Sequence, residues 1–163
     1  MALVVEDGTI VDGANTYASQ ADVDAYHAAM GNKAWAGTGR GAAILRGMAY
    51  LENLRWNGRK KTREQPLSWP RIGMYDSDGY SIPQDEVPSE VVTALCEAAL
   101  VELQEQGSLR TPIKNGGQVT SLKVDGVFAE TYQPGVGDTI YRSVLGKLRG
   151  LVAGHGTIHV RLA

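Results

Sequence analysis

PSEVVTALCEAALVEL, residues 88–103, is the stretch of sequence that decides the fold of this chain. Pro88 suits the first position of a helix, and Glu90 lies near the positive end of the helix dipole. From residue 91 to residue 103 nearly every side chain is apolar, apart from a narrow stripe that contains Thr93 and Glu97. A helix that is apolar almost all round is buried on more than one side. We therefore expect either the central helix of the core or a helix that is also buried against a neighbouring subunit.

Three further helices are predicted around this stretch, over residues 19–30, 39–55 and 139–152. The first begins with Ser19 and Asp22, an imperfect capping box. Apolar residues recur at helical spacing in all three. They are Val23, Tyr26 and Met30 in the first, Ile44, Leu45, Met48, Leu51 and Leu54 in the second, and Ile140, Val144, Leu148 and Leu151 in the last.

The remaining sequence predicts a small amount of β-structure. Two β-prone runs flank Asp125-Gly126, which is a strong hairpin signal and predicts a hairpin over residues 117–133. Residues 157–162 alternate strictly and indicate one C-terminal strand. Residues 56–87 form a long, proline-interrupted connection that is either irregular or contains one hairpin with Asp78-Gly79 at its turn.

The predicted fold is thus mainly α, with about four helices, a small β-hairpin, a long irregular loop and a C-terminal strand. We expect a single helical domain over residues 1–154 and a terminal arm over residues 155–163. A terminal strand without a neighbour must pair elsewhere, and an exposed sheet edge on another chain is a natural place. Ile158, Val160 and Leu162 share one face of this strand and are candidate docking residues.

Composition limits the classes of function. The chain has 163 residues, 16 Lys and Arg against 18 Asp and Glu, and 43% hydrophobic residues, as in a folded soluble protein. The net charge of −2 argues against a stand-alone nucleic-acid binder, which usually carries a strong basic excess. No signal peptide or membrane-spanning stretch is visible, so we expect a protein made in the cytoplasm, without membrane contact.

Catalytic, metal and cofactor chemistry are not expected. His155 and His159 are four residues apart, a spacing that in a strand separates them by ~13 Å, too far to share one ion. Asp76, Asp78 and Gly79 resemble part of a calcium loop, but Met74 would occupy its first ligand position. Cys96 lies in the apolar helix and is interpreted as a core residue. We therefore predict no catalytic residues, no metal, no cofactor and no enzyme.

The densest charged segment is Arg55–Arg63, with five cations and an aromatic residue in nine positions. It could contact a phosphate backbone with Trp56 as a stacking platform, pair with acidic groups of a protein partner, or be a solvated loop. These three interpretations remain open. The candidate contact residues are Arg55, Trp56, Arg59, Lys60, Lys61 and Arg63.

The segment Gln65–Arg71 is of a different kind, because two prolines fix an extended backbone around Trp69. Such a segment either folds over the helical core or docks a partner. We favour local packing, with Trp69 and Arg71 kept as candidate docking residues.

Seven short segments, taken together in their order and spacing, are informative. They are ALVVEDG (2–8), ANTYAS (14–19), DAYHAA (24–29), WNG (56–58), QPLSWPR (65–71), DGY (78–80) and VPSEV (87–91). With these segments the chain resembles the small head–tail connector (adaptor) proteins of tailed bacteriophages, clearly over about residues 1–107 and more loosely beyond. Proteins of this group are often labelled DnaT-like single-stranded-DNA-binding proteins.

The resemblance implies a mostly helical subunit of a ring, commonly of twelve copies, beneath the portal protein in the neck of the virion. Double-stranded DNA would pass through the ring without sequence specificity, and a downstream neck or tail protein would dock below. The family supplies no catalytic residues. We therefore predict a structural connector, and as the alternative a single-stranded-DNA-binding module that uses Arg55–Arg63.

Overall fold

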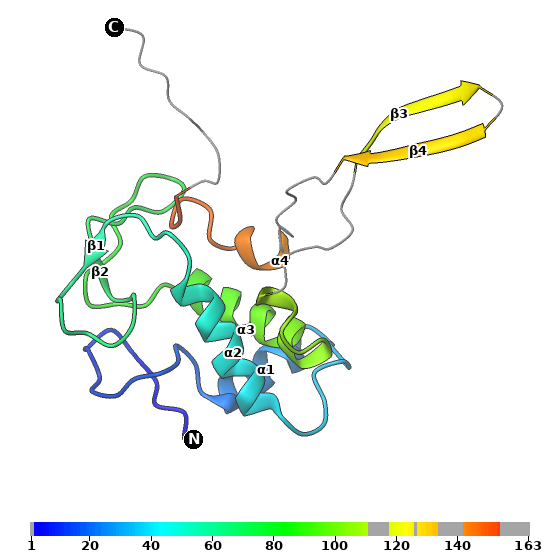
Figure 1. The fold of residues 1–163 in the computed structure, drawn as a ribbon. Coiled ribbons are helices and arrows are strands. Elements are labelled where there is room, and N and C mark those ends of the chain that lie inside the picture. The colour runs from blue at the N-terminus through cyan, green and yellow to red at the C-terminus, as the bar shows by residue number, and fades with distance from the viewer. Residues whose placement is uncertain (1, 111–117, 126, 134–141, 154–163) are drawn as a thin grey trace, which may run out of the picture.

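The structure is a computed structural model and describes residues 2–110, 118–125, 127–133 and 142–153. Helix α3 (Ser89–Gln104) lies at its centre, packed along α2 (Arg40–Glu52) and also in contact with α1 (Gln20–Ala29) and α4 (Arg142–Leu145) (Figure 1). Other elements of the same chain therefore bury α3, as expected of the central core helix, while additional burial against a neighbouring subunit stays a prediction. Its buried residues are Val91, Ala94, Leu95, Cys96, Ala98, Ala99 and Glu102.

Small residues allow α2 and α3 to approach closely. A Cβ atom added to Gly47 of α2 would lie 3.0 Å from the backbone nitrogen of Ala99 and 3.2 Å from the carbonyl carbon of Ala98. Any larger side chain at position 47 would meet the backbone of α3, which cannot move aside as a flexible side chain can.

The carboxylate of Glu102, inside the core, is satisfied by named partners. Glu102 is only 1% exposed and forms an ion pair with Arg46, with 2.9 Å between Oε2 and Nε. Glu102 also accepts hydrogen bonds from the backbone of Gly107 and Leu109, so it fixes the chain that follows α3, including the 3₁₀ turn η1 (Ser108–Arg110). A buried carboxylate with this number of donors is compatible with a core.

The last helix ends earlier than we predicted. Among the described residues helix α4 covers Arg142–Leu145, and residues 146–151 form a series of turns. Residues 139–141 of the predicted helix, with Ile140, lie outside the described residues. The amides of Lys147 and Leu148 donate to carbonyls three residues back, and Gly150 has a φ of +81°. Glycines at 146 and 150 weaken a helix. The predicted apolar positions Val144, Leu148 and Leu151 are nevertheless buried.

Two small antiparallel sheets complete the described chain. Strand β1 (Arg59–Lys60) pairs with β2 (Arg71–Ile72), and β3 (Gln118–Asp125) pairs with β4 (Val127–Gln133). The second pair confirms the hairpin predicted around Asp125-Gly126. The β3–β4 ladder contacts none of the other helices or strands of the described residues and extends away from them in Figure 1. The predicted strand at residues 157–162, with Ile158, Val160 and Leu162, lies outside the described residues.

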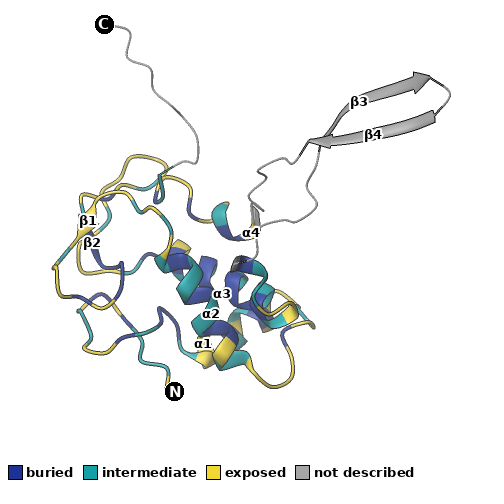
Figure 2. Ribbon diagram, viewed as in Figure 1, coloured by how far each residue is buried: buried dark blue, intermediate teal, exposed yellow. Residues whose placement is uncertain are grey.

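The long connection between α2 and α3 is irregular but ordered by two pairings. Besides β1–β2, Tyr75 and Ser81 form an isolated antiparallel bridge around Asp78-Gly79. The hairpin interpretation is therefore correct for residues 74–82. Figure 2 shows exposed residues along β1 and its flanking loops, and buried residues on the inner sides of the helices.

Candidate nucleic-acid interface

Residues 55–63 are called here the basic loop, and the cationic side chains of this loop face solvent. Arg55, Arg59, Lys60 and Arg63 are exposed, and Lys61 is partly exposed. Among the described residues the ion pairs are Arg40–Asp24 and Arg46–Glu102, so no cation of the basic loop is held by a carboxylate there. The loop thus presents positive charge that can meet phosphates.

A buried arginine holds the basic loop in place. Arg71 is 8% exposed, and its guanidinium donates to the carbonyl oxygens of Asn57 at 2.7 Å, Ser68 at 3.0 Å and Gly58 at 3.1 Å. Burial lowers the pKa of Arg71, an effect that the nearby Tyr17 and Glu52 oppose. The fork of donors on a guanidinium suits this bracing of three carbonyls.

Gln65 fixes the far end of the loop. This side chain is 3% exposed, donates to the carbonyls of Leu67 and Pro70, and accepts from the amide of Thr62. Arg71 and Gln65 therefore anchor the loop from inside, while its charged side chains stay outside.

Gly58 is required where the loop turns. Its φ is +62°, and an added Cβ atom would lie 2.5 Å from the carbonyl oxygen of Ile72 and 2.7 Å from the sulfur of Met74. Only glycine combines this conformation with so close an approach to β2.

A second basic segment, residues 147–149 with Lys147 and Arg149, lies beside the basic loop, although it is far from the loop in sequence. The amide of Asn57 donates to Leu151, its side chain donates to Gly150, and the amide of Ala153 donates to Arg55. Trp56 and Val152 form the bridge of this pairing. Lys147 and Arg149, both exposed, therefore belong to the same region as the basic loop. The sequence analysis did not identify Lys147 and Arg149 as candidates, because no local sequence pattern predicts a pairing between segments more than 90 residues apart.

Trp56, which we suggested as a stacking platform, packs against the core. Its indole nitrogen donates to the carbonyl of Leu51 at 3.1 Å, and its ring packs edge-to-face with Trp69, with centroids 5.7 Å apart. It is partly buried against the core. These contacts give the Trp56 ring a packing role, and base stacking by Trp56 stays an untested prediction.

Trp69 has no exposed surface, so it cannot dock a partner on this fold. The amide of Trp69 donates to the Tyr17 hydroxyl, which donates to Glu52, and Glu52 accepts from the amide and hydroxyl of Ser68. Burial and the Glu52 carboxylate raise the pKa of Tyr17 well above its ordinary value. Local packing, which we favoured, is what the structure shows for Trp69 and Arg71.

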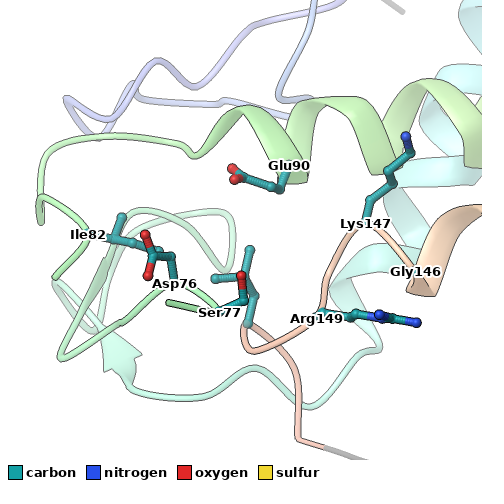
Figure 3. Close-up of a pocket in the computed structure, with 8 residues that line it drawn as sticks. Asp76, Ser77, Ile82, Glu90, Gly146, Lys147 and Arg149 are labelled. Atoms are coloured by element: carbon teal, nitrogen blue, oxygen red, sulfur yellow. The ribbon is translucent and has the colours of Figure 1, made fainter. Parts of the chain in front are cut away.

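An open cavity of about 260 Å³ adjoins the second basic segment (Figure 3). Asp76, Ser77 and Glu90 line one side, and Lys147 and Arg149 line the other. Figure 3 shows the two cationic groups directed away from the two carboxylates. The lysine and the arginine therefore remain available at the surface beside the cavity.

The other candidate groups have structural roles or are not placed. Burial raises the pKa of the Cys96 thiol to about 12, as expected for a core residue. Asp76 accepts from the amides of Asp78 and Tyr80, so this acidic pair belongs to a turn. The described residues contain no group of three or more metal-ligating side chains, and no helix among them is long and apolar enough to cross a membrane. His155 and His159 lie outside the described residues.

Comparison with known proteins gives one family. A family model described as "Putative DnaT-like ssDNA binding protein" matches residues 1–163, the whole chain. No curated protein and no solved structure matches it. The description agrees with the DNA-binding alternative of our two predicted functions better than with the connector.

Proposed function

The chain belongs to the DnaT-like single-stranded-DNA-binding family, and from this premise we propose that it binds single-stranded DNA through the basic loop. The observation that carries the proposal is the exposure of Arg55, Arg59, Lys60 and Arg63 on a loop that Arg71 anchors from inside. A fixed loop loses little conformational entropy when its charges meet phosphates.

The second basic segment supports the same ligand. Residues 150–153 pair with Arg55 and Asn57, so the segment that carries Lys147 and Arg149 lies beside the basic loop although it is far from it in sequence. A strand of several nucleotides can contact both segments at once.

The test is a titration of a fluorescent oligothymidine at several salt concentrations. For single strands, the logarithm of the binding constant falls with the logarithm of salt concentration by about 0.7 per phosphate contact. The double variant Lys60→Gln/Arg63→Gln should weaken binding and reduce this slope by about 1.4 if each cation meets one phosphate.

A matched control exists in the same chain. Lys33→Gln removes one exposed lysine from the connection between α1 and α2, outside the basic loop. This control should bind like the unchanged protein, whereas Lys60→Gln alone should weaken binding and reduce the slope by about 0.7. Equal weakening by Lys33→Gln and Lys60→Gln would show a non-local charge effect, and no binding by the unchanged protein would reject the proposed function.

A second candidate is the connector subunit implied by the resemblance, a ring beneath the portal protein in the virion neck. The β3–β4 hairpin favours it, because this hairpin contacts no other described helix or strand. A two-stranded hairpin alone is only marginally stable in water, so a partner for it is expected. The partner under this candidate is a neighbouring copy or the portal protein.

Electron microscopy of the protein mixed with portal protein tests the connector. A stacked ring is the expected result, and loss of docking is expected when residues 155–163, with Ile158, Val160 and Leu162, are deleted. If the protein stays monomeric and does not bind portal protein, the connector function is rejected, while the DNA-binding function is unaffected.

A further inference from the structure

Tyr75 and Tyr80 are the most exposed large aromatic side chains within residues 2–109. Tyr75 is 57% exposed and Tyr80 is 74% exposed, whereas Trp35 and Trp69 are buried and Trp56 is partly buried against the core. Both tyrosines lie on residues 74–82, called here the tyrosine hairpin.

The tyrosine hairpin is a well-braced support. The amide of Asp76 donates to Tyr80 at 2.9 Å, and the amide of Ile82 donates to Met74 at 3.0 Å. Gly79, with φ of +89°, closes the turn, and the Asp76 carboxylate accepts from two turn amides. Met74 is 1% exposed and anchors the hairpin in the core. The rings are therefore displayed from fixed backbone positions.

The hairpin adjoins both basic segments. It follows β2 directly, and Ile72 of β2 is the pairing partner of Arg59 in the basic loop. On its other side, a Cβ atom added to Gly150 would lie 3.5 Å from the amide nitrogen of Ser77, in the segment that carries Lys147 and Arg149. Figure 3 shows Asp76 and Ser77 of the hairpin across the cavity from that segment.

Cations that follow a phosphate backbone, together with aromatic faces for the bases, are the usual means of binding a single strand without reading its sequence. We propose that Tyr75 and Tyr80 stack on bases of single-stranded DNA whose phosphates lie along the basic loop and the Lys147–Arg149 segment. This inference rests on the proposed function. It assigns the stacking role to the tyrosine hairpin in place of Trp56.

The exposed carboxylate of Asp78 disfavours a phosphate at the turn of the hairpin. The Asp76 carboxylate accepts hydrogen bonds from two amides of the turn. In the proposed complex the bases face the hairpin, and the phosphates face the cations on either side of it.

The experiment compares two oligonucleotides of equal length, oligothymidine and an abasic strand with the same phosphates. The variants are Tyr75→Ala and Tyr80→Ala, singly and together, with Tyr75→Phe/Tyr80→Phe as the matched control that keeps both rings. We expect each alanine to weaken oligothymidine binding about tenfold, with little change on the abasic strand, and the phenylalanine variant to bind normally. Circular dichroism checks that all variants are folded.

The outcomes separate this inference from the proposed function. Alanine variants that bind oligothymidine like the unchanged protein, or that lose the abasic strand equally, overturn the stacking role while DNA binding by the basic loop stands. Alanine variants that keep DNA affinity but fail to associate with portal or with other copies overturn it in favour of a protein contact. Absence of salt-dependent binding of either strand by the unchanged protein rejects the proposed function itself.

Discussion

At the scale of single residues, the hydrogen-bond partners and the burial of His27 determine which of its ring nitrogens carries a proton and in which direction its pKa shifts. His27 is 1% exposed, and its Nε2 lies 3.0 Å from the carbonyl oxygen of Cys96. A carbonyl only accepts, so Nε2 carries the proton and Nδ1 accepts from the side-chain Nδ2 of Asn32 at 3.0 Å. Burial lowers the pKa of His27, although Glu97 and Asp24 act in the opposite direction.

His27 makes stability depend on pH. The unfolded chain takes up a proton on this residue near pH ~6.5, whereas the folded chain resists it, so the free energy of unfolding falls as pH drops below that value. Urea unfolding at pH ~7.5 and ~5.5 measures the change, and His27→Gln should show a smaller pH dependence. The same pH slope in both proteins would contradict this account.

Cys96 should be chemically silent in the folded protein. A pKa of about 12 leaves very little thiolate at neutral pH, and the side chain is only 2% exposed. We expect a thiol reagent at pH ~8 to react at least about a thousandfold more slowly than in denaturant. Rapid labelling of the native protein would show that α3 opens.

Arg71 should contribute far more to the free energy of unfolding than the exposed cations of the basic loop do. Arg71→Met leaves three carbonyls of the loop without their donor, and we expect the free energy of unfolding to fall by about 3 kcal/mol. Arg63→Met, an exposed arginine of the same loop, is the matched control and should change stability by less than about 0.5 kcal/mol. Urea unfolding of both variants gives the comparison.

At the scale of elements, the contact between α2 and α3 has one critical position. Gly47→Val places atoms against the backbone of Ala98 and Ala99, and we expect a loss of about 1–3 kcal/mol. Gly41→Ala in the same helix meets only the Gln20 side chain at 3.5 Å and should be neutral or stabilising, by up to about 1 kcal/mol. Thermal unfolding distinguishes the two; a neutral Gly47→Val would mean that the helices can separate at little cost.

Sequence patterns predicted some elements better than others. The capping box of Ser19 and Asp22 is present in α1, and the bounds of α2 and α3 are close to those expected. Periodicity failed at the last helix, because Val144, Leu148 and Leu151 keep their apolar face while the glycines replace the helix by turns. Burial of a face and continuity of a helix are separate properties, and only the first follows from apolar spacing.

At the scale of the whole molecule, the helical core does not depend on the β3–β4 hairpin. Because this hairpin contacts no other described element, replacing residues 117–133 by a short glycine-serine linker should leave the midpoint of thermal unfolding unchanged. Light scattering on the same variant shows whether association between copies is lost, as the connector candidate expects. A lowered midpoint would mean that the hairpin contributes to the core.

The sequence by itself determined the apolar central helix, the hairpin at Asp125-Gly126, the exposed cations of residues 55–63 and the burial of Cys96. These properties follow from periodicity, turn chemistry and charge, which act over a few residues. Only the tertiary structure decided that Trp56 packs while Tyr75 and Tyr80 stay exposed, and that Lys147 and Arg149 join the basic loop. Which side chains are buried depends on which segments, distant in sequence, pack against each other, and the spacing of residues within one segment does not specify this packing.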